Sequence, residues 1–284
     1  MNGAMSSTDS YLSLILNIPN ISPISILGYF FLAMFRIVPI IALAPFLGGK
    51  NLPNPIKIMF AISLTAIILP QIIFQGSGEL LFDMRFVGLG LKELLIGAIL
   101  GFLVAIPFYI AQNSGTIVDH MRGASSLQVT DPTTQTQTSS IGIFYNYVLI
   151  AVFFAVDGPI VFFNTLIQSF QLIPVTDLIN PAFFSLKIPL WQLVISLFNH
   201  IMSMAIQLAA PCIVGILMAE MFLGIANRLA PQVQIVFLGI PLKSWLGLFC
   251  LLISWYFIMQ QLAKESLDWI NTLNQMMAKM PKIS

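Results

Sequence analysis

Charged residues are few in this sequence, and several lie where a charge is costly unless it has a role. Arg36, Asp157 and Glu220 each interrupt a long apolar run. A charge near the centre of such a run costs at least ~2.5 kcal/mol on membrane-insertion scales, so it must face protein or water. We therefore expect an ion pair between helices, joining Arg36 to Asp157 or to Glu220, in preference to a relay of protons.

Two further charges, Lys92 and Glu93, are adjacent near the start of another apolar run. Neighbouring residues of a helix point about 100° apart and do not form the (i, i+4) pairs that stabilise helices. We expect each of these side chains to meet a different neighbour at the edge of a membrane. Glu220 and Arg228 cannot bond each other either, because a straight helix separates them by ~12 Å.

The sequence contains no recognisable catalytic or metal-binding pattern. His120 and His200 are far apart and have no carboxylate or thiolate at the spacing of metal ligands. There is no HExxH motif, no Walker A loop and no arrangement that suggests a Ser-His-Asp triad. We predict no catalytic residue, no cofactor and no metal. Cys212 and Cys250 lie in apolar runs, which predicts two small buried side chains rather than a disulfide.

The longest polar stretch runs from Gln112 to Ser140. It exceeds the roughly 2–8 residues that usually connect two helices. A segment of this composition is either a solvated connector or a loop that lines an aqueous path, where irregular backbone is tolerated. The second role would belong to a loop over residues 115–140, with Gly115, Asp119, Arg122, Gly123, Asp131 and Pro132 as its candidate residues.

The composition of the whole chain indicates a membrane protein. Of its 284 residues, 58% are hydrophobic and 8% are charged, whereas soluble chains have about 45–50% and about 25%. The formal net charge of +1 leaves no basic face for a nucleic acid. Residues 1–10 contain no Lys or Arg, so the basic start of a cleavable signal peptide is missing and we expect the first apolar run to be retained.

Six apolar runs are each long enough to cross a bilayer as a helix, which needs about 20 residues. They are continuous rather than alternating, which favours helices over a strand barrel. The runs cover approximately residues 23–47, 55–74, 86–115, 141–170, 190–229 and 233–273. We therefore predict an all-α fold made of membrane-associated helical hairpins.

The last two runs are longer than a membrane requires. A straight helix of about 40 residues measures ~60 Å, against a hydrocarbon core of ~30 Å. Pro211 could kink the fifth helix. Otherwise these helices project well beyond the lipid, and because apolar surface cannot face water over that length, neighbouring proteins are implied. In the third run, Gly97 and Gly101 have the spacing of small residues that lets two helices approach closely.

The short connections indicate the orientation, because cytoplasmic loops of membrane proteins are enriched in Lys and Arg. Lys50, Lys57, Arg122, Arg228 and Lys243 lie at the connections that follow the first, third and fifth runs. We expect these connections in the cytoplasm and both termini on the other side.

The connection between the last two runs has the most distinctive sequence. Residues 227–232 read Asn-Arg-Leu-Ala-Pro-Gln, and residues 239–243 read Gly-Ile-Pro-Leu-Lys. Pro231 is expected to end one helix, and Gly239 and Pro241 are expected to mark the start of the next. Arg228 and Lys243 would hold this hairpin at the cytoplasmic surface.

This hairpin closely resembles the T component of the type III secretion export apparatus, a family whose flagellar members are called FliR. Further matches follow in the same order along nearly the whole chain: residues 36–46, residues 92–97, and Arg122-Gly123 leading to Asp131-Pro132. Residues 237–244, which read Phe-Leu-Gly-Ile-Pro-Leu-Lys-Ser, are more similar to the injectisome members, which serve virulence, than to the flagellar ones.

The resemblance implies a subunit of an export gate that contains R, S and T components and is partly raised out of the inner membrane towards the periplasm. Residues 1–188 would form an R-like part, and residues 189–284 an S-like helical hairpin. The 115–140 loop would match the plug that obstructs the closed pore. A docking surface for the gate's U component would include Arg228, Pro231, Gln232, Gln234, Pro241 and Lys243. Alternatively, the two cations only anchor the hairpin.

The sequence therefore predicts a multi-pass, non-enzymatic protein of the bacterial inner membrane, in contact with lipid and forming a channel for unfolded secreted proteins. Energy would come from elsewhere, because no nucleotide-binding motif is present. The charges expected to support assembly are Arg36, Lys92, Glu93, Asp157 and Glu220. The leading alternative is a secondary transporter with Arg36, Asp157 and Glu220 at a site near the membrane midplane. A membrane-embedded enzyme is the weakest alternative.

Overall fold

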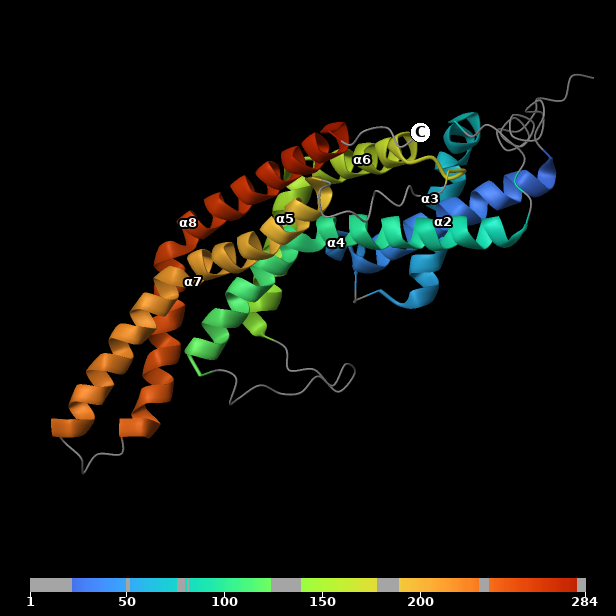
Figure 1. Cartoon of the computed structure of the whole chain (residues 1–284). Helices are drawn as coiled ribbons and strands as arrows, with labels where there is room; N and C mark the ends of the chain where they lie inside the picture. Colours follow the sequence, from blue (N-terminus) through green and yellow to red (C-terminus); the bar gives the residue numbers. More distant parts are fainter. Residues whose placement is uncertain are drawn as a thin grey trace, which may run out of the picture. The chain divides into compact units, whose positions relative to one another are not determined.

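The computed structural model describes residues 22–49, 52–75, 80, 82–123, 139–177, 189–229 and 235–279 (Figure 1). Every regular element in these ranges is helical, which confirms the predicted all-α class. Six residues with predicted roles lie outside the described ranges: Lys50, Asp131, Pro132, Pro231, Gln232 and Gln234.

The helices follow the apolar runs in order. They are α2 (Pro23–Leu43), a short 3₁₀ turn (Pro45–Leu47), α3 (Asn54–Gln75), α4 (Met84–Met121), α5 (Ser140–Ala155), α6 (Gly158–Leu172), α7 (Pro189–Leu229) and α8 (Ile235–Lys279). Among the described residues, five helices are long and apolar enough to cross a membrane, namely α2, α3, α4, α7 and α8. The bent pair α5 and α6 makes a sixth candidate if it is counted as one span.

The fourth apolar run does not form one continuous helix, which corrects the predicted span of residues 141–170. α5 ends at Ala155, α6 begins at Gly158, and the two are bent by 78°. Asp157 lies in the break with a φ of 57°, a left-handed conformation that Asp tolerates better than most residues. Asp157-Gly158-Pro159 is a turn signal set among uniformly apolar neighbours.

α4 extends further than predicted, as far as Met121, through polar residues of the predicted 115–140 loop. Gly115 and Asp119 are therefore helical. The polar residues do not end the helix because this part of α4 packs against α5: a Cβ atom on Gly115 would lie 2.6 Å from the backbone of Gly142. Gly123, with a φ of 81°, has the left-handed conformation that often follows a helix end.

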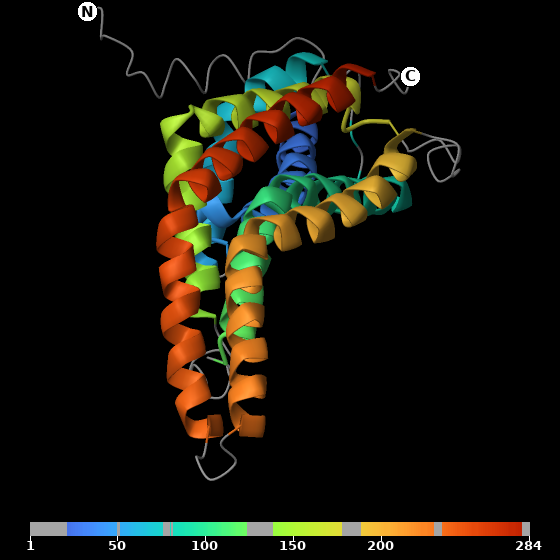
Figure 2. The same ribbon diagram turned by 90° about the vertical axis from the view of Figure 1, so that its left-hand side faces the viewer.

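The last two helices are as long as their apolar runs suggest, with 41 residues in α7 and 45 in α8. They lie side by side as an antiparallel pair (Figures 1 and 2). Gly239 and Pro241 do not mark the start of α8, because the helix already begins at Ile235. A proline at this position removes one backbone hydrogen bond without ending the helix here.

The described residues fall into two compact units. The first lies within Met1–Ala105, Phe162–Ile188 and Leu273–Ser284, and the second within Ile106–Val161 and Pro189–Thr272. The predicted division into residues 1–188 and 189–284 concerns family-related parts, which these units do not test, so it stays a prediction.

In the first unit, α2 and α4 touch at glycines. A Cβ atom on Gly97 would lie 2.2 Å from the carbonyl oxygen of Arg36, and one on Gly101 would lie 2.9 Å from the Cα atom of Ile40. Real Cβ atoms do not approach other atoms so closely, so only glycine permits this contact. The predicted close approach at Gly97 and Gly101 is confirmed, and it fixes the buried face of α2 against α4.

Candidate functional site

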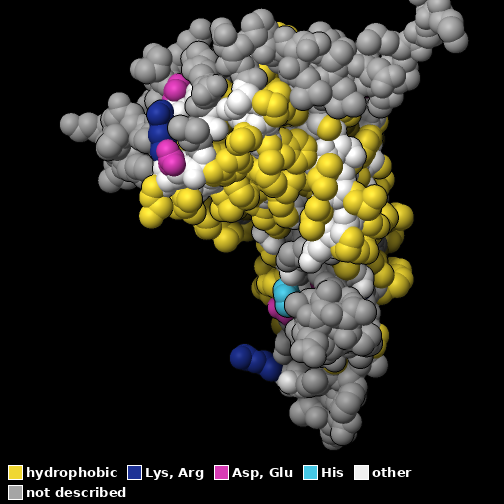
Figure 3. Space-filling view, turned by 90° about the vertical axis from the view of Figure 1, so that its right-hand side faces the viewer, with side chains coloured by type: hydrophobic (Ala, Val, Ile, Leu, Met, Phe, Trp, Pro, Cys, Tyr) yellow, Lys and Arg dark blue, Asp and Glu magenta, His cyan; other side chains and the backbone are white. Residues whose placement is uncertain are grey.

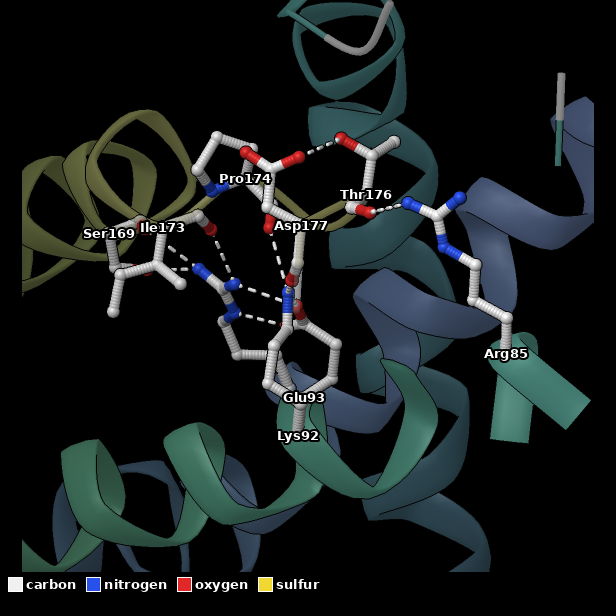
Figure 4. Close-up of polar contacts among 9 residues, drawn as sticks. Arg85, Lys92, Glu93, Ser169, Ile173, Pro174, Thr176 and Asp177 are labelled. Atoms are coloured by element: carbon white, nitrogen blue, oxygen red, sulfur yellow. Dashed lines mark hydrogen bonds and ion pairs between the residues drawn. The ribbon is translucent and has the colours of Figure 1, made fainter. Parts of the chain in front are cut away.

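Arg36 on α2 is fully buried, and every N–H group of its guanidinium has a partner. Its partners Glu93, Ser169 and Ile173 are shown in Figure 4. Nε donates to Glu93 Oε2 at 2.5 Å, and Nη2 donates to Glu93 Oε1 at 2.9 Å. Nη1 donates to the carbonyl and hydroxyl oxygens of Ser169, at 2.8 and 3.2 Å. Nη2 also donates to the carbonyl of Ile173 at 2.7 Å. All five N–H donors of an arginine are thus used.

Lys92 on α4 belongs to the same cluster. Its ammonium group donates to the carbonyl oxygens of Pro174 and Asp177, at 2.7 and 2.9 Å, and lies 2.7 Å from Glu93 Oε1. An ammonium group has three donors, so this group is also saturated. The side chains of Lys92 and Glu93 are 3% and 0% exposed, which places both inside the protein.

The two cations hold the chain where α6 ends. Ser169 lies in the last turn of α6, and residues 173–177 follow that helix. The final carbonyl groups of a helix lack helical partners and carry partial negative charge, so cations bind there favourably. The ring of Phe170 lies 4.2 Å from the guanidinium carbon of Arg36 and adds a cation–π contact. The Arg36–Lys92–Glu93 cluster therefore joins α2 and α4 to the C-terminal end of α6.

This geometry corrects two predictions. Arg36 is paired, as expected, but its partner is Glu93 rather than Asp157 or Glu220. Lys92 and Glu93 do not meet separate neighbours at a membrane edge, since both contact the same buried cluster. The sequence feature that indicates Glu93 as the partner of Arg36 is Gly97, which permits close contact between α4 and α2. Glu93 lies one helical turn before Gly97 on α4, so both face the same point on α2.

A second polar cluster lies in the other compact unit, where α4 ends and α5 begins. Asp119 is 1% exposed and accepts a hydrogen bond from Arg122 Nε at 2.7 Å. Its other oxygen accepts from the Ser139 hydroxyl at 2.5 Å and from the Ile141 N–H at 3.0 Å. We call Asp119, Arg122, Ser139 and Ile141 the 119–141 neck, because they join the two ends of residues 124–138.

The neck is also bound to α8. Arg122 Nη1 donates to the hydroxyl of Ser244 at 3.3 Å. One turn further along α8, a Cβ atom on Gly247 would lie 3.5 Å from the Cβ atom of Arg122. The Arg122 side chain therefore packs along α8, and it links the predicted pore loop to the C-terminal hairpin.

Among its described residues, the α7–α8 hairpin carries one ion pair and one histidine–carboxylate contact. Lys243 donates to Glu220 at 2.6 Å, and His200 Nε2 lies 3.1 Å from Glu265 Oε2. Glu220 is thus paired across the hairpin, not with Arg36. Arg228 is exposed in the last turn of α7.

These arrangements are suited to holding helices together. The described residues contain no group of three or more His, Cys, Asp or Glu placed to hold a metal ion. Cys212 and Cys250 are free thiols, the first buried and the second half-buried. In the Arg36–Lys92–Glu93 cluster, no cationic donor is left over to bind another molecule.

Comparison with known proteins agrees with the helix and motif pattern. Residues 27–268 match the family described as bacterial export proteins, family 1. The chain is 30% identical to the secretion system apparatus protein SsaT of Salmonella typhimurium, over 78% of this chain and 82% of SsaT. It is 29% identical to the Yop proteins translocation protein T of Yersinia pestis, over 84% of this chain and 87% of that protein.

A flagellar relative is similar to the same extent. The flagellar biosynthetic protein FliR of Bacillus subtilis is 29% identical over 78% of this chain and 84% of its own length. Since the family match covers well over half of the chain and the matches cover 82–87% of these relatives, the chain belongs to family 1 of the bacterial export proteins, the family of type III secretion T components and flagellar FliR proteins.

Proposed function

We propose that this protein is a non-enzymatic subunit of a type III secretion export gate and forms part of the inner-membrane channel for unfolded protein substrates. Membership of the export family supports the process. The names of SsaT and the Yop translocation protein T, together with residues 237–244, support an injectisome rather than a flagellum.

The observation that carries the proposal is the uncovered apolar surface of the α7–α8 hairpin. In the most apolar stretch of α8, 17% of the residues are buried within the chain, against 61% in α4. α7 and α8 have 41 and 45 residues, and both bend along their length (Figure 2). Measured along its axis, a helix of this length is ~60 Å or more, about twice the hydrocarbon thickness. Lipid cannot cover all of this surface, so other protein subunits must cover the remainder. The R, S and U components of the export apparatus are the partners that the family relationship suggests.

Exposed hydrophobic side chains also form a broad patch outside the hairpin (Figure 3). On α3 and α4 the exposed apolar side chains include Ile67, Phe74 and Leu91, at 74%, 70% and 62% exposure. Such a surface fits contact with lipid or with a membrane-embedded partner. A multi-pass position in the bacterial inner membrane accounts for it.

The contacts of the three residues argue against the alternative, a secondary transporter with Arg36, Asp157 and Glu220 at its site. Arg36 has no donor left for a substrate. Glu220 is engaged by Lys243, and Asp157 is an exposed residue at a helix break. A transporter site needs groups that can change partners during transport, whereas the Arg36 cluster is closed.

Purification through an affinity tag in mild detergent separates these two functions. An export-gate subunit co-purifies with the R and S components, and a fraction also carries the U component. A transporter purifies alone or as a small homo-oligomer. Recovery of the chain without these partners, from cells whose secretion is intact, would refute the proposal.

The connection between α4 and α5, which is the non-helical part of the predicted 115–140 loop, is proposed to narrow the closed channel. Its described ends form the 119–141 neck, while residues 124–138 lie outside the described ranges. Shortening residues 126–136 while keeping the neck should raise ion leakage through the assembled complex. Unchanged conductance with normal assembly would assign the loop to a simple connector.

A further inference from the structure

We propose that the α7–α8 hairpin controls how firmly the 119–141 neck is held. The path of contacts runs from Glu220 through Lys243, Ser244 and Arg122 to Asp119, all within one compact unit. The proposal does not require residues 124–138 to act as a plug, so it holds or fails independently of the proposed function.

The first step is the convergence of the neck on one carboxylate. Asp119 receives donors from both ends of residues 124–138: the Arg122 guanidinium from α4, and the Ser139 hydroxyl and the Ile141 N–H from the start of α5. A carboxylate at a helix N-terminus is favoured by the helix dipole. Because the same buried group serves both ends, the two ends separate only when its hydrogen bonds break.

The second step is the double engagement of Arg122. Its Nε and Nη2 atoms each lie 2.7 Å from Asp119 Oδ1, while Nη1 donates to Ser244 on α8. The guanidinium group is planar and rigid, so its nitrogens move together. Gly247 lies beside this side chain, since a Cβ atom added there would be in van der Waals contact with the Arg122 Cβ atom, at 3.5 Å. A shift of the first turns of α8 therefore changes the geometry of Arg122 at Asp119.

The third step is the ion pair beside Ser244. Lys243, the adjacent residue, binds Glu220 at 2.6 Å and so fixes this part of α8 to α7. The side chains of Lys243 and Glu220 are 27% and 41% exposed, so a partner can reach both. A partner segment that carries a charge and competes for either side chain would release α8 at this point, and the release would reach the neck through Ser244.

Tryptic cleavage after Arg122 measures the state of the neck, since an arginine held by Asp119 is poorly available to the protease. Cleavage of a transiently opened site follows the population of the open form. The experiment uses the full chain in permeabilised native membranes, with mass spectrometry of the fragment that ends at Arg122. Asp119→Asn should raise the cleavage rate about tenfold, the factor for ~1.4 kcal/mol.

The coupling is tested at a distance from the neck. Glu220→Gln should raise cleavage after Arg122 about two- to fivefold, as expected for the loss of a partly exposed ion pair. In a Ser244→Ala background the same substitution should add nothing, because the path is already broken. Exchanging the charges with Glu220→Lys and Lys243→Glu should restore the slow rate, which shows that the pair, not either residue alone, is responsible.

Two controls make the result specific. Glu265→Gln removes the partner of His200 in the same hairpin but away from the path, and it should leave cleavage after Arg122 unchanged. Ser266→Ala removes a hydroxyl on α8 whose described hydrogen bond is to the carbonyl of Ala263 in its own helix, and it should also leave cleavage after Arg122 unchanged. Wild-type cleavage in Glu220→Gln, an equal increase in the Ser244→Ala background, or an equal increase in Glu265→Gln would each overturn the proposal.

Discussion

At the scale of single residues, we expect the Arg36–Lys92–Glu93 cluster to contribute strongly to the stability of the first unit. Replacing Arg36 with leucine leaves the Glu93 carboxylate buried with only Lys92 beside it, and it frees the carbonyls of Ser169 and Ile173. Breaking one partner of a buried ion pair typically costs about 3–5 kcal/mol. We expect Arg36→Leu to reduce the folded, assembled protein in membranes severalfold, as measured by native gel and by the unfolding midpoint in detergent.

Arg85 provides a matched control, because it is the same residue type near the same segment. It is exposed, and its one described hydrogen bond reaches the carbonyl of Thr176 at 3.4 Å. Surface substitutions of this kind usually change stability by less than about 0.5 kcal/mol. Arg85→Leu should therefore assemble like the wild type, and equal losses in Arg85→Leu and Arg36→Leu would disprove the special role of the cluster.

The sequence predicts that Arg36 is buried and paired, but it does not predict the partner. Burial follows from the energetic cost of a charge within an apolar run, which a single segment reveals. The partner depends on which helices touch and in what register, and this is decided by Gly97 against the backbone of Arg36. A pattern of side chains cannot predict which carbonyl groups among residues 169–177 accept these hydrogen bonds, because every residue type has a backbone carbonyl group.

At the scale of helices, the contact between α2 and α4 depends on the absence of a side chain at Gly97. A Cβ atom there would meet the backbone of Arg36, at 2.2 Å from its carbonyl oxygen, and backbone cannot turn aside as a side chain can. Overpacking of this kind typically costs about 1–3 kcal/mol. Gly97→Ala should lower the unfolding midpoint of the isolated chain in detergent.

Gly224 on α7 is the control for that substitution, because a Cβ atom added there meets nothing within 4 Å. Alanine is favoured over glycine in a helix by roughly 1 kcal/mol. Gly224→Ala should therefore leave the isolated chain as stable as the wild type or slightly more so. If both alanine variants behave alike, helix propensity rather than close packing governs Gly97.

The break between α5 and α6 makes a separate prediction at Asp157. Its φ of 57° favours glycine, and a left-handed conformation costs a residue with a β-branched side chain about 1–3 kcal/mol. Asp157→Gly should retain normal stability and assembly, whereas Asp157→Val should lower both. Assembly is measured on native gels. A severe assembly defect in Asp157→Gly would show that the carboxylate itself is needed, as the intramembrane pairing hypothesis requires, and would contradict a purely conformational role.

The apolar runs predict the helices well, because burial in a membrane demands long apolar segments and leaves little freedom in their placement. The errors occur where a local conformation overrides composition. Residues 116–121 lie in the predicted loop yet are helical, since Gly115 packs on Gly142 and Asp119 binds the start of α5. The 141–170 run is apolar yet broken, since one residue adopts a positive φ.

At the scale of the whole molecule, the exposed side chains of the α7–α8 hairpin help to distinguish a membrane protein that acts alone from a subunit of a complex. Leu252 and Tyr256 on α8 are 72% and 73% exposed, and they lie one turn apart on the same face. A lone protein would present such a face to lipid. The length of α8 and the small share of it that is buried favour a protein neighbour instead.

A photo-reactive phenylalanine analogue at Tyr256 tests which neighbour is present. In native membranes, we expect ultraviolet light to link this position to another membrane protein of the export apparatus, with a discrete shift in mass identified by mass spectrometry. The same analogue at Tyr145, an aromatic residue that is 0% exposed within the chain, should give only products inside the chain. The contrast follows from burial alone, because the reactive group can attack only atoms that touch it. If Tyr256 yields lipid adducts or no adduct while secretion remains active, the α8 face is not covered by a subunit, and the hairpin is not the contact surface of the export gate.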